Sequence, residues 1–302
     1  MPVVDVHTHF SIETSPVSGD AEKLGYRVEN RSITEHLAVM DALGIDVAVL
    51  SCPTIKYTLD RPCCIRYIRE VNKEGSRLSR EYPQRFVFAA ALPLPFIPDA
   101  LEELECAKAD GACAAALVSN YEGMYLGDQR LEPLWTKLES LDMPVLLHPA
   151  APQVYPSGPV TGKILPMFEF IVDTTRSVID MICSGVFSRH PGLKVVVPHA
   201  GSCLPVALNR MRNVMLGTGR DVSLPVENLW YDLACDSFPQ GVPILLEWTA
   251  PDHILYGTDF PAIPLPVLKD HLYAARTSPR LALFQEEILW KNAQALFRLS
   301  LC

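Results

Sequence analysis

Short apolar runs alternate with longer amphipathic stretches along the 302-residue chain. The apolar runs have the length and the β-branched content of buried parallel strands. We expect these strands at residues 3–7, 47–51, 86–92, 112–118, 145–148, 194–198, 229–233 and 254–257. Eight strands with helices between them predict an α/β fold, a (β/α)8 barrel of the TIM type, as a single domain spanning residues 1–302. A doubly wound open sheet is the competing arrangement.

Start and stop residues delimit the helices between the strands. Residues 33–43 form an amphipathic stretch that ends at Gly44, and residues 66–82 form another that ends before Pro83, because glycine and proline both end helices. Further helices are expected at 131–141, at 174–189 with Asp173 as the N-cap, and at 284–297. The Pro- and Gly-containing segments 11–32 and 149–168 predict long loops after the first and fifth strands.

Side chains that can bind a metal stand at the carboxyl ends of four predicted strands. The first strand ends in His7 and His9, the fifth ends in His148, and the sixth and eighth lead into His199 and Asp259. Residues two apart on a strand share a face, so His7 and His9 make half of a metal site. Strand ends meet at one mouth in a barrel, whereas distant strands of an open sheet need not meet, and this favours the barrel. A Gly-rich phosphate fingerprint is also missing after the first strand, which disfavours a dinucleotide-binding fold.

Composition narrows the functional classes. A hydrophobic share of 49% with 20% charged residues is typical of a soluble globular protein, and the net charge of -9 argues against nucleic acid or an anionic membrane as a main partner. No apolar run reaches the roughly 20 residues of a membrane helix, and the start of the chain carries no secretory signal. Nine scattered cysteines without paired CxxC spacing predict reduced thiols and a cytoplasmic location.

Beyond the strand ends, longer strings carry a family resemblance. The constellation of HxH, two further histidines and an aspartate resembles the amidohydrolase superfamily. Four longer strings narrow the resemblance: Phe-Ile-Val-Asp-Thr-Thr-Arg at 170–176, Phe-Ser-Arg-His-Pro-Gly-Leu-Lys at 187–194, His-Ala-Gly-Ser at 199–202 and Tyr-Gly-Thr-Asp-Phe-Pro at 256–261. They resemble the branch that contains aminocarboxymuconate-semialdehyde decarboxylase and relatives acting on hydroxybenzoates, and the closest likeness is to 6-methylsalicylate decarboxylases.

The resemblance implies a metal site with His7, His9, His148 and Asp259 as ligands of one divalent ion. Three imidazoles and a carboxylate suit Zn²⁺, with Mn²⁺ as the alternative. His199 takes the place of the family's acid/base histidine. The fourth strand ends in Val-Ser-Asn at 118–120, without the lysine that bridges two metals in many superfamily hydrolases, which favours a single metal. A homodimer is expected from the resemblance alone.

The implied reaction is the non-oxidative loss of CO₂ from a small carboxylic acid. The substrate would be an ortho-hydroxybenzoate such as 6-methylsalicylate, or a muconate-like acid. Asp259 would deliver the proton to the ring carbon, with His199 assisting in acid/base work. A metal-dependent hydrolase of a lactone or related cyclic carboxylate would use the same ligands and His199, and stays open as the alternative. A non-catalytic binding protein on the same barrel is the third hypothesis.

Residues that would contact the substrate are less clearly marked. Arg176 is a candidate for holding the substrate carboxylate, in competition with Arg27 and Arg31. Phe10 is a candidate for the wall of an aromatic pocket and equally for barrel packing. Asp5 lies two residues before His7 on the predicted strand, so its side chain should point the same way and form a hydrogen bond with a metal ligand. The remaining expectations are solvated surface positions for His36 and His271, a structural role for His190, and a place at the mouth for Cys235.

Overall fold

The computed structural model describes residues 1–12, 31–52, 60–153, 165–218, 224–225, 227–235 and 237–300. Eight parallel strands form one sheet in the order β1-β2-β3-β4-β7-β8-β9-β10. They are β1 (Val4–His9), β2 (Val47–Ser51), β3 (Phe86–Ala91), β4 (Ala114–Val118), β7 (Val145–His148), β8 (Val195–Val197), β9 (Leu229–Asp232) and β10 (Ile254–Leu255). Each lies within two or three residues of a predicted strand.

The first and last strands meet, which closes the sheet into a barrel. The backbone N–H of Val6 donates to the carbonyl of Tyr256 at 3.0 Å, and that of His9 donates to the carbonyl of Phe260 at 2.8 Å. Gly257 allows this closure, because a Cβ built there would lie 2.8 Å from the Cβ of His7, closer than side chains pack. The predicted (β/α)8 barrel is therefore confirmed, and the open sheet is wrong.

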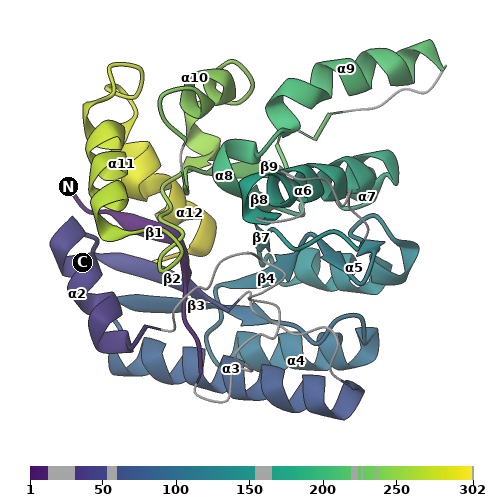
Figure 1. The fold of residues 1–302 in the computed structure, drawn as a ribbon. Coiled ribbons are helices and arrows are strands. Elements are labelled where there is room, and N and C mark those ends of the chain that lie inside the picture. Colours follow the sequence, from purple (N-terminus) through teal and green to yellow (C-terminus); the bar gives the residue numbers. More distant parts are fainter. Residues whose placement is uncertain are drawn as a thin grey trace.

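Helices surround the strands on the outside (Figure 1). The α-helices are α2 (Ile33–Leu43), α3 (Arg61–Glu81), α4 (Ile97–Ala109), α5 (Glu132–Ser140), α6 (Leu165–Cys183), α7 (Val186–Arg189), α8 (Pro198–Gly201), α9 (Leu204–Gly217), α10 (Gly241–Leu246), α11 (Leu265–Thr277) and α12 (Asn292–Phe297). Shorter elements are the 3₁₀ turns η1 (Gln129–Leu131) and η2 (Pro251–His253), the π-helical η3 (Glu287–Lys291), and a hairpin of β5 (Asn120–Tyr121) and β6 (Met124–Tyr125). None of the described helices is both long and apolar enough to cross a membrane.

The start of α6 differs from the prediction. The helix begins at Leu165, so the sequence 165–168 is helical rather than part of the expected loop, and Asp173 lies inside the helix instead of capping it. The Asp173 side chain is fully buried and accepts hydrogen bonds from Asn120 at 2.7 Å and from the Tyr125 hydroxyl at 2.6 Å. Asp173 thus bonds to buried side chains from residues 120–125 and does not cap the start of a helix. The rest of the two expected long loops lies largely outside the described residues.

Alternating strand residues divide the core into two parts. Val47 and Val49 of β2 belong to a cluster that includes Leu146 and Leu255, whereas Ala48 and Leu50 pack with the helices in the larger cluster. This alternation follows from the two-residue period of a strand. Leu296 and Phe297 of α12 join the first cluster. The strands are thus fixed from both sides, which holds their carboxyl ends in place.

Candidate metal centre

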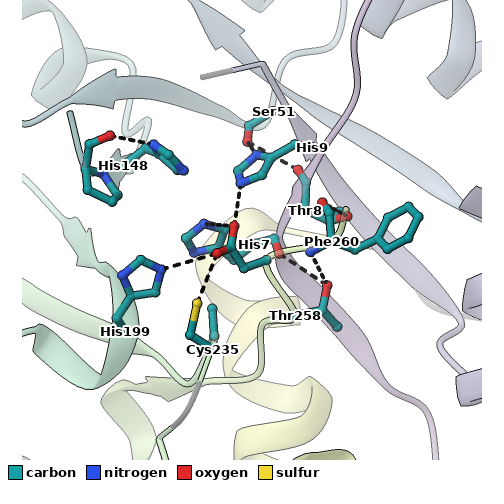
Figure 2. Close-up of polar contacts among 12 residues, drawn as sticks. His7, Thr8, His9, Ser51, His148, His199, Cys235, Thr258 and Phe260 are labelled. Carbon is teal, nitrogen blue, oxygen red and sulfur yellow. Dashed lines mark hydrogen bonds and ion pairs between the residues drawn. The ribbon is translucent and has the colours of Figure 1, made fainter. Parts of the chain in front are cut away.

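Four side chains meet where the carboxyl ends of the strands converge. His7 and His9 end β1, His148 ends β7, and Asp259 follows β10. One ligand atom from each lies within 4.8 Å of the ligand atoms of the others. Figure 2 shows the imidazoles of His7, His9 and His148 gathered at this end of the barrel. The structure therefore brings the four predicted ligands together at the face where barrel active sites lie.

The three imidazoles are fixed through their outer nitrogens. Nδ1 of His7 lies 2.9 Å from Oδ2 of Asp232, and Nδ1 of His148 lies 2.8 Å from the carbonyl oxygen of Pro149. Both partners accept hydrogen bonds, so Nδ1 carries the proton in both rings. Nδ1 of His9 lies 2.9 Å from the Ser51 hydroxyl, which itself donates to the carbonyl of Thr8. The Ser51 oxygen must then accept from His9, so this ring has the same tautomer.

This tautomer leaves the inner Nε2 atoms as electron-pair donors. Nε2 of His7 is buried without a hydrogen-bond partner, although Oδ1 of Asp259 lies 3.5 Å away. Nε2 of His9 lies 3.0 Å from the same oxygen. Nitrogen and oxygen ligand atoms that face one another at these distances leave a place where a cation would bind. The donor set, three imidazoles with outer hydrogen bonds and one carboxylate, fits a divalent metal.

Burial and neighbouring charges set the electrostatics of the cluster. Burial lowers the pKa of His9 and of His148, which keeps both rings neutral. Burial alone would also lower the pKa of His7, but the Asp232 carboxylate outweighs it and raises the pKa to about 9. Burial would raise the pKa of Asp259, yet its contacts with His9 and His7 hold it below its usual range. The carboxylates thus create a negative potential that favours a cation at the centre.

His199 lies beside this cluster at the end of β8. Its ring stacks on His7 with the centroids 5.2 Å apart, and its Nε2 lies 3.8 Å from Oδ2 of Asp259. The backbone N–H of His199 donates to Oδ1 of Asp232 at 3.1 Å. His199 adopts a φ of 59°, in the left-handed region that non-glycine residues rarely occupy. The strand end is thus bent so that the imidazole faces the second oxygen of Asp259.

Asp5 connects the two segments that carry ligands. Its carboxylate accepts hydrogen bonds from the backbone N–H of His7 at 3.1 Å and from the N–H and hydroxyl of Thr258 at 3.0 and 2.6 Å. Burial raises the pKa of Asp5 to about 7. The register of β1 against β2 shifts between Asp5 and Thr8, and both Val6 and His7 line the cavity beside the cluster. Asp5 therefore contacts the predicted ligand His7 through its backbone N–H, and not through its imidazole.

Three contributors to the site were missed or left undefined by the sequence reasoning. Asp232 and Ser51 orient His7 and His9, and the Cys235 thiol donates to Oδ2 of Asp259 at 3.0 Å. Asp232 ends β9, so the same rule that selected His148 would have selected it. Ser51 ends β2 but has no chemical feature that separates it from other serines.

The candidates for substrate contact lie in different surroundings. Phe10 is buried in the main hydrophobic core. Arg176 is on α6, with its side chain 48% exposed, and Nη1 donates to the Tyr125 hydroxyl at 3.0 Å and to Oδ1 of Asp173 at 3.2 Å. Arg31 forms an ion pair with Glu35, and Arg27 lies outside the described residues. The cavity beside the histidine cluster has apolar walls that include Val6, Ala116 and Leu146.

The two histidines expected at the surface are in fact buried. His36 is 3% exposed and His271 is 6% exposed. Nε2 of His36 lies 3.1 Å from the Thr8 hydroxyl, and its ring contacts Phe86 and Phe260. The amphipathic pattern of α2 does not indicate that His36 contacts β1. Its partner Thr8 lies between the predicted ligands His7 and His9. His190 lies within ion-pair distance of Glu132 and Glu139, which agrees with the structural role expected for it.

Comparison with known proteins agrees with this geometry. A family model described as amidohydrolase matches residues 4–299. The 6-methylsalicylic acid decarboxylase of Penicillium expansum is 27% identical over 291 residues, which cover 87% of this chain and 86% of that protein. A structure described as amidohydrolase II has a TM-score of 0.91 at 27% identity, covering 98% of this chain and 100% of that one.

A second solved structure adds a bound small molecule to the comparison. The crystal structure of 2,6-dihydroxybenzoate decarboxylase complexed with 2,6-dihydroxybenzoate has a TM-score of 0.84 at 25% identity, with 99% of this chain and 100% of that chain covered. The family match extends over nearly all of the barrel and includes every strand end that contributes to the histidine cluster. The chain belongs to the amidohydrolase family.

Proposed function

We propose that this protein is a metal-dependent, non-oxidative decarboxylase of a small aromatic acid that carries a hydroxyl group ortho to its carboxylate. The observation that carries the proposal is the convergence of His7, His9, His148 and Asp259 beside His199. The relatives supply the substrate class. One is named for 6-methylsalicylic acid and the other was solved with 2,6-dihydroxybenzoate, and both compounds place a hydroxyl beside the carboxylate.

His7, His9, His148 and Asp259 are the residues that would hold the divalent metal. When bound, the ion would act as a Lewis acid on the substrate carboxylate and its ortho oxygen. Zn²⁺ is the proposed ion because three imidazoles and a carboxylate match its preferred donors, and Mn²⁺ is the alternative. Metal analysis of protein purified without chelators distinguishes the two, and a site that binds neither would contradict the assignment.

The reaction needs a proton but no oxidant. The bond between the ring carbon and the carboxylate carbon breaks, CO₂ leaves, and a proton takes its place on the ring carbon. We assign this proton to Asp259 and His199, whose Oδ2 and Nε2 atoms are 3.8 Å apart. That separation lets the two groups exchange a proton after a small movement, and burial of both keeps bulk water from competing.

Positioning of the substrate is assigned to two further residues. Arg176 would hold the carboxylate with the guanidinium nitrogens that Tyr125 and Asp173 leave unused. Phe10 follows His9 directly and would contact the aromatic ring from the core. We also propose a cytoplasmic homodimer. The eight cysteines among the described residues are all thiols, as in reducing compartments, and light scattering tests the dimer.

The direct test is an assay with a matched set of acids. The metal-loaded protein is incubated with 6-methylsalicylate, 2,6-dihydroxybenzoate and 3-hydroxybenzoate, and both CO₂ and the phenol product are measured. We expect the two ortho-hydroxy acids to react at least about tenfold faster than the meta isomer. A cyclic ester such as dihydrocoumarin tests the hydrolase alternative. Ring opening of the ester without CO₂ release from any acid would overturn the proposal.

A further inference from the structure

The two oxygens of Asp259 face two different sets of side chains. Oδ1 contacts the Nε2 atoms of His9 and His7 at 3.0 and 3.5 Å. Oδ2 contacts Sγ of Cys235 at 3.0 Å and Nε2 of His199 at 3.8 Å. In Figure 2, dashed lines from His9, His199 and Cys235 meet at this one carboxylate. Asp259 thus bridges the proposed metal site and a second group of metal-binding atoms.

The second group has the dimensions of a metal site. Ligand atoms of His199, Cys235 and Asp259 all lie within 4.8 Å of one another. In tetrahedral coordination with bonds of about 2.0–2.3 Å, ligand atoms are separated by about 3.3–3.8 Å. The observed separations of 3.0 and 3.8 Å from Oδ2 lie close to that range. Only small side-chain shifts are therefore needed to accommodate an ion.

Two features point to a ligand in this group. Nε2 of His199 is buried and makes no hydrogen bond, so its electron pair or proton is directed at the space beside Oδ2. All three residues also have left-handed backbones, with φ values of 59° for His199, 59° for Cys235 and 62° for Asp259. Three such conformations at one point show that the turns after β8, β9 and β10 are all shaped to present these side chains.

We propose that His199, Cys235 and Asp259 form a second divalent cation site, selective for thiophilic ions such as Zn²⁺ and Cd²⁺, whose occupation inhibits the enzyme. The thiolate distinguishes it from the first site, whose four donors are nitrogen and oxygen. Binding displaces the thiol proton to solvent and leaves the sulfur on the ion. Inhibition follows because His199 then binds the ion and no longer exchanges protons. Only the inhibition rests on the proposed function; the cation site itself does not.

Cadmium provides a spectroscopic probe for the site. Protein with Cys106 and Cys183 replaced by serine, which removes two exposed thiols, is loaded with one equivalent of Zn²⁺ and titrated with Cd²⁺. We expect a second equivalent to bind with a thiolate-to-cadmium charge-transfer band in the ultraviolet, accompanied by loss of CO₂ release. The first site contains no sulfur, so exchange of Zn²⁺ for Cd²⁺ there gives no band.

Single substitutions in this background define the outcome. Cys235→Ser should retain the first equivalent, lose the band, and raise the Cd²⁺ concentration for half-inhibition at least about tenfold. Cys203→Ser, at a cysteine of similar partial burial, should keep the band and the inhibition. His199→Gln serves as a second variant and should also lose the second equivalent while retaining the first.

The results separate the two proposals. An unchanged band in Cys235→Ser, or no second equivalent in the parent protein, would overturn the second site. Uptake of the second equivalent with the band, by a protein that releases CO₂ from none of the acids, would support the site and overturn the proposed decarboxylase instead.

Discussion

Nδ1 of His7 donates a hydrogen bond to Oδ2 of Asp232 at 2.9 Å, and both side chains are almost completely buried. The other oxygen of Asp232 accepts the backbone N–H groups of His199 and Ala234. One carboxylate therefore fixes the tautomer of a proposed metal ligand and the position of the proposed acid/base histidine. Loss of the Asp232 carboxylate should therefore affect both metal binding and the placement of His199.

Replacement of Asp232 tests this coupling. Asp232→Asn keeps the shape of the side chain but removes its charge, so we expect metal affinity to fall by about 10–100-fold. Competition with a chelator of known affinity measures the change. Asp110→Asn, at an exposed position, is the control and should bind metal like the parent protein. Equal affinities for the Asp232 variant and the control would contradict the role of Asp232.

His148 and His199 should differ in what their loss removes. His148→Ala deletes a proposed ligand, so metal and activity should disappear together. His199→Asn should keep the metal and lose at least about 100-fold in turnover, because general acid/base groups contribute that much or more. Metal content and CO₂ release are measured on the same samples. Equal metal loss in both variants would place His199 among the ligands and not beside them.

The buried carboxylate of Asp173 should contribute strongly to stability. It accepts hydrogen bonds from Ser119, Asn120 and Tyr125, and Asp173→Ala would leave these donors unpaired. We expect a loss of about 3 kcal/mol in the free energy of unfolding, measured by urea denaturation. Asp110→Ala is the exposed comparison and should change stability by less than about 0.5 kcal/mol. A change below about 0.5 kcal/mol in the free energy of unfolding of Asp173→Ala would contradict the structural role of these hydrogen bonds.

Glu132 should make stability depend on pH on the acidic side. Its hydrogen bond from Arg189 lowers the pKa of Glu132 from 4.5 to about 2. A depressed folded-state pKa gives stability that is present above the unfolded value and lost as pH falls through the folded one. The pair is partly exposed, so we expect about 1 kcal/mol at most.

Urea unfolding of Glu132→Gln and the parent at several pH values checks this effect. The variant should be less stable at pH 7, and the difference should shrink as the pH falls from about 5 towards 2. A difference that is constant over this range would show that the carboxylate charge is not responsible.

Much of this arrangement could be predicted because it depends on strand ends. Apolar runs located the strands, and the residues that close those runs included His7, His148 and Asp259. The barrel then requires these ends to meet, whatever their distance in the sequence. Asp232 ends β9 and obeys the same rule, but the strand predicted at 229–233 extended one residue beyond it.

Other features depended on tertiary contacts that periodicity does not encode. Asp5 bonds to Thr258 at the far end of the chain, and the buried Asp173 inside α6 bonds to Asn120 and Tyr125. His36 lies on a helix with an ordinary amphipathic pattern, yet it bonds to Thr8 of β1. In each case the partner belongs to a distant segment, so local sequence could not reveal it.

Anomalous diffraction at the absorption edge of the loaded metal shows whether His7, His9, His148 and Asp259 bind one ion. We predict one principal peak in a singly loaded crystal, about 2.0–2.3 Å from Nε2 of His7, His9 and His148 and from a carboxylate oxygen of Asp259. A peak elsewhere, or an Asp259 carboxylate that lies outside coordination distance of the ion, would contradict it.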